Sequence, residues 1–193
     1  MKIGVLGSAC NPPHNGHIRA ALSVKRLLKL DRIIIIPTKV PPHKDRPEVS
    51  APRRLRMARL AVANKHGWSV SDIELRRPGK SYTRDTVAAL KKKYPSDEIF
   101  WIVGSDSIVS MPWQWRGGYG ILDLCTFVVL PRRGSSLARV PRNILKKVVV
   151  LPRDKSWDIS STMIRNRIRT GKKVGSFLHP EVLRFIKYHK LYV

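Results

Sequence analysis

The sequence predicts an α/β protein with a Rossmann-like, doubly wound parallel sheet, in a single domain with a C-terminal helical segment. Short runs of β-branched and aromatic residues alternate along the chain with segments of helical periodicity, and this order favours right-handed βαβ crossovers. The length of 193 residues suits one domain with its own hydrophobic core. We find no internal repeat and no linker, so we expect one domain over residues 1–193.

The first βαβ unit lies at the start of the chain. Lys2–Leu6 is an apolar run that predicts a strand, and Ile18–Leu30 carries apolar residues at helical spacing. Ile33–Ile36 is an unbroken β-branched run, which is typical of a parallel strand buried on both faces. The prolines between Pro37 and Pro52 then predict a long loop. Because loops of that length are usually functional, this one could close over a bound anion.

The remaining elements continue the alternation, with capping residues, glycines and prolines at their expected ends. In chain order, we expect a helix over Arg53–Lys65, a strand over Trp68–Leu75, a helix capped by Ser81 or Thr83 that runs to about Tyr94, strands over Glu98–Val103, Thr126–Leu130 and Val148–Leu151, a helix from Ser160–Thr162 to Thr170, and a last helix from Pro180 to about His189. Residues 111–120 are rich in aromatic side chains, and residues 135–147 carry no clear pattern.

Residues 7–17 follow the first strand directly and lead into the first helix. Open α/β sheets bind ligands at such turns, where helix N-termini offer free N–H groups and positive partial charge to phosphate. His14 and His17 are three residues apart, so a helical first turn would place both imidazoles on one face. Gly16 has no side chain that could block a nucleotide. The turn therefore predicts a phosphate site with two imidazoles.

Two further segments, 104–106 and 159–165, fall at the same edge of the predicted sheet. Main-chain N–H groups at residues 7–9 can face phosphate, and Asp106 can accept hydrogen bonds from ribose hydroxyls. The hydroxyl side chains of the last segment stand at a predicted helix start and can donate to phosphate oxygens. Arg165 can bind phosphate through a bidentate fork, which lysine cannot form. The three segments together predict a nucleotide site.

Composition bounds the class of protein and its partners. The net charge is +25, with 38 Lys and Arg against 13 Asp and Glu, and the basic residues are spread along the whole chain. This predicts attraction to polyanions, at least incidentally. Two cysteines, Cys10 and Cys125, give no disulfide framework. No run approaches the roughly 18 apolar residues of a membrane span and no signal peptide is evident, so we expect a cytoplasmic protein without a membrane partner.

Two motifs resemble signatures of the nucleotidyltransferase superfamily. His14-Asn15-Gly16-His17 resembles the His-x-Gly-His signature, and Ile159–Arg165 resembles the second signature, Ile-Ser-Ser-Thr-x-Ile-Arg. Within that superfamily the chain is similar to the nicotinate-mononucleotide adenylyltransferases. Four further pieces carry this similarity, which covers nearly the whole chain: Pro41–Lys44, Ser81–Thr86, Gly104–Asp106, and Trp115, twelve residues before Phe127.

The resemblance implies transfer of AMP from ATP to the 5′-phosphate of nicotinate mononucleotide, which gives deamido-NAD and pyrophosphate in NAD biosynthesis. It implies in-line attack on the α-phosphorus without a covalent enzyme intermediate, so positioning and charge neutralisation would dominate catalysis. Mg²⁺ is the implied cofactor, held mainly through the ATP phosphates and water. The lack of a carboxylate cluster in the sequence agrees with this, and we expect no protein-held metal.

The resemblance also assigns roles to individual residues. His14, His17 and Arg165 would be catalytic, contacting phosphates and stabilising the transition state. The expected ATP-binding residues are Gly7, Ser8, Ala9, Gly16, Gly104, Asp106, Ile159, Ser160, Ser161 and Thr162. The expected mononucleotide-binding residues are Lys44, Tyr82, Thr83, Thr86 and Trp115. Trp113 competes with Trp115 for stacking on the pyridine ring, and the spacing to Phe127 favours Trp115.

The first motif departs from the family pattern before its histidines. The family usually has Gly-Gly-Thr-Phe-Asp where this chain has Gly7-Ser8-Ala9-Cys10-Asn11. Ser8 is larger than glycine where the backbone must approach phosphate, and Ala9 lacks the threonine hydroxyl. Arg133 also replaces the proline of the family's Arg-Pro-Gly. These changes bear on the phosphate contacts and on efficiency rather than on the reaction class.

Two alternatives stay open at this point. The first is an adenylyltransferase for nicotinamide mononucleotide or for another phosphate acceptor, such as phosphopantetheine or a polyol phosphate. The second is a non-enzymatic nucleic-acid binder, suggested by charge alone. The Ser81–Thr86 stretch argues against the non-pyridine acceptors, and charge explains neither the histidines nor residues 159–165. The sequence does not decide the oligomeric state.

Overall fold

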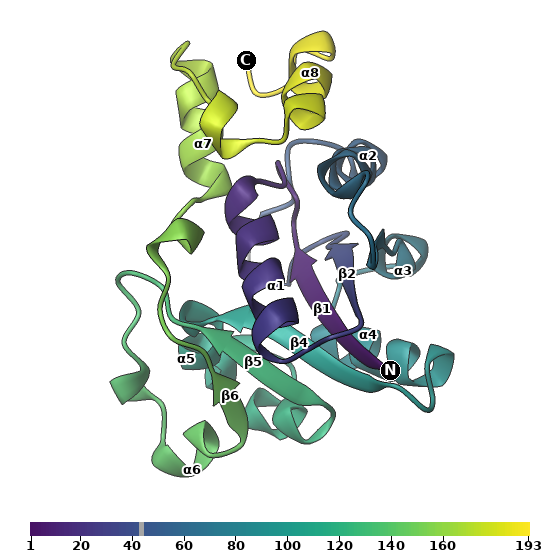
Figure 1. Ribbon diagram of the computed structural model, residues 1–193, viewed down its shortest axis with the longest axis vertical. Helices are drawn as coiled ribbons and strands as arrows, with labels where there is room; N and C mark the ends of the chain where they lie inside the picture. The colour runs from purple at the N-terminus through teal and green to yellow at the C-terminus, as the bar shows by residue number, and fades with distance from the viewer. Residues whose placement is uncertain (43–44) are drawn as a thin grey trace.

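The described part of the chain, residues 1–42 and 45–193 of a computed structural model, forms a six-stranded parallel sheet in the order β3-β2-β1-β4-β5-β6. The strands are β1 Lys2–Ser8, β2 Arg32–Pro37, β3 Trp68–Val70, β4 Glu98–Gly104, β5 Thr126–Leu130 and β6 Val148–Val150. The chain winds outward from β1 to β3, and then from β4 to β6 on the other side (Figure 1). The doubly wound fold is therefore confirmed, with its switch point between β1 and β4.

Helices cover both faces of the sheet. The helix bounds are α1 Asn15–Leu27, α2 Ala51–Val62, α3 Ile73–Arg76, α4 Thr83–Lys93, α5 Ser105–Gln114, α6 Arg142–Leu145, α7 Ser161–Arg169 and α8 Pro180–Tyr188. One apolar cluster joins the sheet to α1 and α2, and a second joins its opposite face to α4, α5 and α6. In Figure 1, α1 lies in front of the sheet and α5 behind it.

The unbroken isoleucine run of β2 follows from this double cover. Ile33 and Ile35 point into the cluster under α1 and α2, whereas Ile34 and Ile36 point into the cluster under α4 and α5. All four side chains are at most 2% exposed. A strand with water on one face would alternate apolar and polar residues, so the unbroken apolar run indicates a strand that is buried on both faces.

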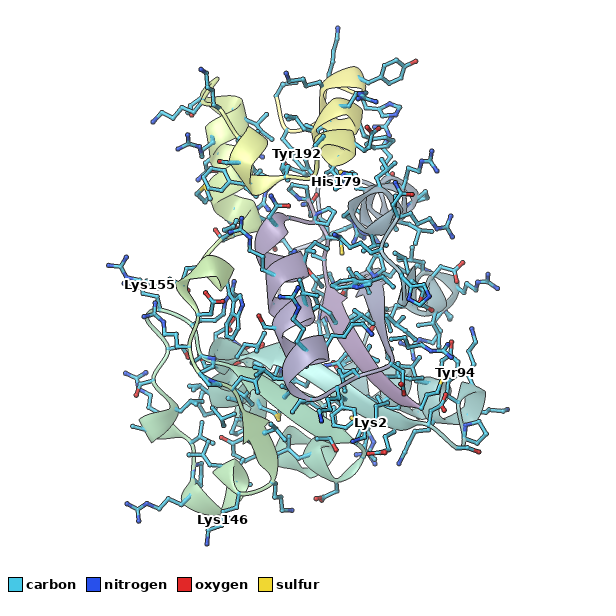
Figure 2. The ribbon with its side chains drawn as sticks, in the orientation of Figure 1. Lys2, Tyr94, Lys146, Lys155, His179 and Tyr192 are labelled. Atoms are coloured by element: carbon cyan, nitrogen blue, oxygen red, sulfur yellow. The ribbon has the colours of Figure 1, made fainter. Side chains whose placement is uncertain are left out.

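The predicted C-terminal helical segment is confirmed and packs beside α2. Met57 of α2, Ile164 of α7 and Val182 of α8 are fully buried in a third apolar cluster. The chain end then returns toward the first turn, where the Tyr192 hydroxyl donates to Asn11 Oδ1 at 2.8 Å. Figure 2 shows Tyr192 beside the C-terminal segment, above the N-terminal end of α1. The C-terminal end of the chain therefore meets the turn after β1 at residue 11.

The expected strand over Trp68–Leu75 is wrong after Val70. Strand β3 pairs only with β2, over three residues, and the chain then turns into the short helix α3. The apolar alternation of Ile73 and Leu75 belongs to that helix, which turns Glu74 into the protein. Edge strands end early when no second neighbour extends the ladder, and periodicity over so few residues does not separate the two structures.

The expected cap of the helix that begins near Thr83 also needs correction. A hydroxyl cap from Ser81 or Thr83 is absent, because Tyr82 stands at the N-cap of α4 and the Ser81 hydroxyl accepts the Lys39 N–H at 3.1 Å instead.

Helix α5 was not predicted, since Pro112 and neighbouring aromatic residues obscure its period. Within residues 1–42 and 45–193, no helix has the length and apolar character needed to span a membrane.

Arg54 in α2 connects the loops at the carboxyl end of the sheet. Its side chain is only 1% exposed. The guanidinium donates to the carbonyls of Ala9 and Thr38, each at 2.6 Å, and to those of Val49 at 3.0 Å and Lys39 at 3.1 Å. One buried cation thus satisfies main-chain acceptors from the turn after β1 and from the segment after β2.

We predict that Arg54→Met lowers the free energy of unfolding by about 2–4 kcal/mol, because it leaves several buried carbonyls without donors. Urea denaturation followed by circular dichroism measures the change. Arg53→Met is the matched control: Arg53 is the exposed neighbour on the same helix, and we expect a change within about 0.5 kcal/mol. Equal stability of the two variants would contradict the role given to Arg54.

Candidate active site

A cavity of about 960 Å³ opens at the carboxyl ends of β1 and β4. The three segments predicted to converge, 7–17, 104–106 and 159–165, all contribute residues to its lining. Residues 81–84 and, in the loop after β2, residues 38, 41–42 and 45–48 also line it. The switch point of the sheet therefore holds a large cavity, as expected for an open α/β sheet.

The two histidines form a stacked pair in one wall of this cavity. Helix α1 begins at Asn15, three residues before the predicted start, so His14 is its N-cap and His17 lies in its first turn. The ring centroids are 3.7 Å apart and the ring planes differ by 21°. This confirms the expected placement of both imidazoles on one face.

Hydrogen bonds fix the tautomer of His17. The His14 main-chain N–H donates to His17 Nδ1 at 3.3 Å, and His17 Nε2 lies 3.1 Å from Ser8 Oγ. Because Nδ1 accepts, a neutral ring carries its proton on Nε2 and donates it to the Ser8 hydroxyl. The His14 Nδ1 atom is buried and has no hydrogen-bond partner in the described structure.

Burial keeps both histidines neutral. Desolvation lowers the pKa of His14 far below its usual range, with smaller contributions from His17 and Arg132. Desolvation, followed by the charge of Arg132, lowers the pKa of His17 to about 4. At neutral pH each ring therefore keeps a single N–H and carries no positive charge.

Gly16 allows α1 to approach the C-terminal signature. A Cβ atom at this position would lie 3.0 Å from His14 Nδ1 and 3.1 Å from Ile159 Cβ, closer than most real contacts. Ile159 is buried behind Gly16 and does not line the cavity. The structure therefore does not bring Ile159 to the position expected of an ATP-binding side chain, and gives it a packing contact instead.

The start of α7 lies beside the first turn and forms the adjoining part of the cavity wall. Ser160 is the N-cap and its hydroxyl accepts the Met163 N–H at 3.1 Å. The Ser161 hydroxyl donates to the Pro12 carbonyl at 2.8 Å, which ties the two signature segments together. Ser160, Ser161 and Thr162 all line the cavity, as expected.

Arg165 reaches the cavity but already has protein partners. Its Nη1 donates to the Asn11 carbonyl at 2.9 Å, and its Nε lies 3.3 Å from Glu48 Oε1. The other oxygen of Glu48 pairs with Arg169 at 2.5 Å. Sequence reasoning missed Glu48 and Arg169, whose proximity to Arg165 depends on how the loop after β2 folds back onto α7.

Gly104, Asp106 and Arg132 form the wall at the end of β4. A side chain at Gly104 would collide with Asp106 and with the Arg132 side chain. Asp106 is about half exposed, and its Oδ1 lies 3.9 Å from Arg132 Nη1. The Arg132 main-chain N–H donates to Ser105 Oγ at 2.9 Å. Arg132 was not among the predicted site residues, although it lies only two residues after the predicted strand that ends at Leu130.

Aromatic residues line the far end of the cavity. Tyr82, Thr83 and Trp115 line it as expected, and Trp115 packs edge-on against Phe127 with centroids 6.4 Å apart. Trp113 does not line the cavity and is 72% exposed. The geometry therefore favours Trp115 as a stacking surface. Lys44, the remaining candidate for this end, lies outside the described residues.

Thr86 supports this end of the cavity from behind. It is fully buried and does not line the cavity, so the structure does not place it where a mononucleotide would touch it. Its hydroxyl donates to Glu74 Oε1 at 2.8 Å and accepts from Arg77 Nη2 at 2.5 Å. Burial raises the pKa of the Glu74 carboxyl, which lines the cavity.

The turn after β1 presents Gly7, Ser8 and Ala9 to the cavity, as expected. Cys10 follows with a φ of +50° and a side chain that is 1% exposed. Burial raises the pKa of its thiol to about 12. A neutral, inaccessible thiol is not a nucleophile, so Cys10 belongs to the core.

Comparison with known proteins agrees with this geometry. Residues 5–167 match the cytidylyltransferase-like family. The probable nicotinate-nucleotide adenylyltransferase of Geobacter sulfurreducens is 38% identical, with 100% of this chain and 98% of the relative covered. That of Shouchella clausii is 37% identical, with 99% and 96% covered. The chain belongs to the nicotinate-nucleotide adenylyltransferase family.

Solved structures share the fold of this family. The Plasmodium falciparum nicotinic acid mononucleotide adenylyltransferase complexed with NaAD superposes with a TM-score of 0.82 at 18% identity, covering 99% of this chain and 97% of that one. A putative nicotinate-nucleotide adenylyltransferase from Vibrio parahaemolyticus gives a TM-score of 0.74 at 20% identity, covering 99% and 94%. The protein thus has the fold of its family.

Arginines that sequence reasoning did not select dominate the charge of the cavity. The lining includes Arg46, Arg84, Arg116, Arg132 and Arg169 besides Arg165. At the aromatic end, the Arg116 guanidinium lies 5.5 Å from the centroid of the Tyr82 ring. The high net charge was the available signal, but it could not say which of 38 basic residues face the cavity.

The acidic side chains that line the described cavity do not form a metal-binding site. Among the described residues, no three His, Cys, Asp or Glu side chains gather as a metal-ligand set. Asp106 faces Arg132, and Glu48 pairs with two arginines. This cationic lining suits phosphate oxygens, including those of a metal–triphosphate complex.

We predict that acid destabilises the protein through its neutral histidines. Between pH 6.5 and pH 4 the unfolded chain takes up a proton on His17 that the folded chain does not, so the free energy of unfolding falls as pH falls, by at most about 1.4 kcal/mol per pH unit for this residue. Denaturation of wild type and His17→Gln at pH 7, 6 and 5 measures the difference. We expect a shallower acid dependence for His17→Gln.

His66→Gln, at an exposed position, serves as the control and should follow the wild-type pH dependence. If His17→Gln also followed the wild-type curve, the neutral state given to His17 would be wrong.

Proposed function

We propose that the protein transfers AMP from ATP to the 5′-phosphate of nicotinate mononucleotide, releasing pyrophosphate and forming deamido-NAD. One observation carries the proposal: the first turn and the start of α7, joined by the bond from Ser161 to Pro12, lie side by side in the lining of a cavity that also contains Tyr82 and Trp115. Full-length similarity to probable nicotinate-nucleotide adenylyltransferases supports the same reaction.

The reaction needs an aligned pair of substrates more than an acid or a base. An oxygen of the mononucleotide phosphate attacks the α-phosphorus of ATP, and the bond from that phosphorus to the β-phosphate bridging oxygen breaks. The electron pair leaves with pyrophosphate, whose charge must be stabilised. Neutral histidines and nearby arginines provide donors and positive charge without a proton transfer step.

In this proposal the two signatures hold the triphosphate. The neutral imidazoles of His14 and His17 line this part of the cavity at the start of α1, and the free main-chain N–H groups at the start of α7 add the positive end of a helix. Arg165 binds phosphate when it exchanges its contact with Glu48 for a phosphate oxygen. Arg132, which lies beside Asp106 at the end of β4, adds a second guanidinium. Asp106 is half exposed and able to accept from ribose hydroxyls.

The pyridine ring occupies the aromatic end. Trp115 offers a flat surface there, and the main-chain N–H groups of Tyr82 and Thr83 at the start of α4 are available to the nicotinate carboxylate. The hydrogen-bonded group of Glu74, Arg77 and Thr86 holds this helix start in place. The arginines at this end favour a carboxylate over a neutral amide.

Mg²⁺ is proposed to arrive with ATP, since the described cavity has arginines to bind phosphates but no carboxylate cage for an ion. When bound, it would neutralise part of the triphosphate charge. A cytoplasmic location, where ATP is present, and weak incidental binding of polyanions belong to the same proposal, and the latter would decline steeply with salt.

We predict that purified protein with ATP and Mg²⁺ releases pyrophosphate with nicotinate mononucleotide at least tenfold faster, as kcat/KM, than with nicotinamide mononucleotide, because the cavity's guanidiniums favour a carboxylate. A coupled pyrophosphate assay and chromatography of the dinucleotide product measure both reactions. His17→Ala is the negative control for contaminating activity. No product with either mononucleotide would refute the proposed reaction.

We predict that Trp115→Ala raises the KM for the mononucleotide about tenfold or more, since loss of a stacking surface removes about 1–3 kcal/mol of binding, while the KM for ATP stays within about twofold. Trp113→Ala is the matched control, an exposed tryptophan two residues away, and should leave both KM values unchanged. The opposite pattern would assign the stacking role to Trp113.

A further inference from the structure

Ser8 stands at the carboxyl end of β1, in contact with His17 and open to the cavity. The resemblance noted above expects glycine at this position and a hydroxyl side chain at the next. This chain has the reverse order, with a hydroxyl at Ser8 and none at Ala9. The question is what the displaced hydroxyl does.

The hydrogen bonds around Ser8 Oγ leave one direction open. A hydroxyl accepts two hydrogen bonds and donates one. Ser8 Oγ accepts from the Cys10 main-chain N–H at 3.3 Å and, given the tautomer fixed by His14, from His17 Nε2–H at 3.1 Å. Both acceptor positions are filled. The proton of the Ser8 hydroxyl has only the Cys10 sulfur beside it, which is a weak acceptor. A phosphate oxygen in the cavity would be a stronger partner for this proton.

The same bond takes the only N–H of His17. Once Nε2–H points at Ser8, the ring has no second proton to offer to a phosphate, because Nδ1 accepts from the main chain. A neutral imidazole therefore reaches a ligand in the cavity through the serine hydroxyl or not at all. Successive hydrogen bonds polarise one another, so a hydroxyl that accepts from His17 is a stronger donor than a free one.

We propose that the Ser8 hydroxyl is the group that contacts a phosphate oxygen of ATP on behalf of His17, and that it replaces the hydroxyl missing at Ala9. This inference rests on the proposed use of ATP as substrate. Ser8 is thus a binding residue, and His17 acts through it as a positioning residue. Ala9 cannot take that part, since it has no polar side-chain atom, and its carbonyl is held by Arg54.

The test compares four variants with wild type: Ser8→Ala, Ser8→Gly, the double variant Ser8→Gly/Ala9→Thr, and Ser23→Ala. Ser23 lies on α1 away from the cavity lining and controls for loss of a serine hydroxyl. Two readouts are used. Calorimetric titration with ATP and Mg²⁺ needs no acceptor, and steady-state kinetics with nicotinate mononucleotide gives kcat and both KM values. Thermal melting of each variant reports folding.

We expect Ser8→Ala and Ser8→Gly to weaken ATP binding about fivefold or more and to lower kcat about a hundredfold, the lower end of the range seen when one preorganised donor is removed, with the mononucleotide KM within twofold. The double variant should recover most of both losses. In wild type, ¹⁵N-edited NMR should show His17 as the Nε2–H tautomer with a slowly exchanging proton, which exchanges faster in Ser8→Ala.

The proposal is overturned if folded Ser8→Ala keeps ATP affinity and kcat within twofold of wild type, or if kcat rises. It is also overturned if Ser8→Gly/Ala9→Thr is no better than Ser8→Gly. Failure of the proposed function would look different: wild type itself would make no dinucleotide from a pyridine mononucleotide. The ATP titration would then still decide the part of Ser8.

Discussion

A parallel sheet covered by helices on both faces leaves its strand ends as the places where main-chain groups are free for a ligand. In this protein the cover is complete enough that the isoleucines of β2 are buried on alternate sides. The order of strands reverses between β1 and β4, so the connections leaving these two strands run to opposite faces. The cavity forms between them, and each part of the site lies there because of that reversal.

Burial and charge have separate roles in this cavity. The protein carries a net charge of +25, yet the two histidines in the wall stay neutral because burial and the nearby Arg132 disfavour their protonation. Positive charge comes from guanidiniums instead, and Glu48 and Asp106 offset part of it. Arginine keeps its charge at any physiological pH, so the cavity attracts phosphate without depending on the titration of histidine.

Sequence patterns predicted the strands whose side chains are buried on both faces of the sheet. The runs ending at Leu6, Ile36, Val103 and Leu130 lie in strands, as is typical of short apolar runs in a parallel sheet that is buried on both faces. The convergence of segments 7–17, 104–106 and 159–165 could also be predicted, because the topology of a parallel sheet brings the carboxyl ends of its strands to one edge. Patterns failed at β3, where three residues of edge strand give no period, and at α5, where Pro112 stands inside a helix.

The parts of the site that escaped prediction depend on tertiary contacts. Glu48 meets Arg165 only because a loop folds back onto α7, and Arg132 meets Asp106 only because Gly104 has no side chain between them. The resemblance placed Ile159 and Thr86 against substrates, whereas the structure buries both one layer behind the wall. A motif indicates which residues share a task, but not which of them touch the ligand and which hold the others.

The same distinction explains how the first turn can depart from its family pattern and keep its path. Three side chains from elsewhere hold it by main-chain oxygens: Arg54 binds the Ala9 carbonyl, Ser161 the Pro12 carbonyl and Arg165 the Asn11 carbonyl. Main-chain acceptors do not depend on the side chain that the residue carries. Residues 8 and 9 can therefore change while the backbone stays in place. What such a change alters is the set of polar atoms offered to the cavity, which is why the hydroxyl of Ser8 matters chemically while the fold does not depend on it.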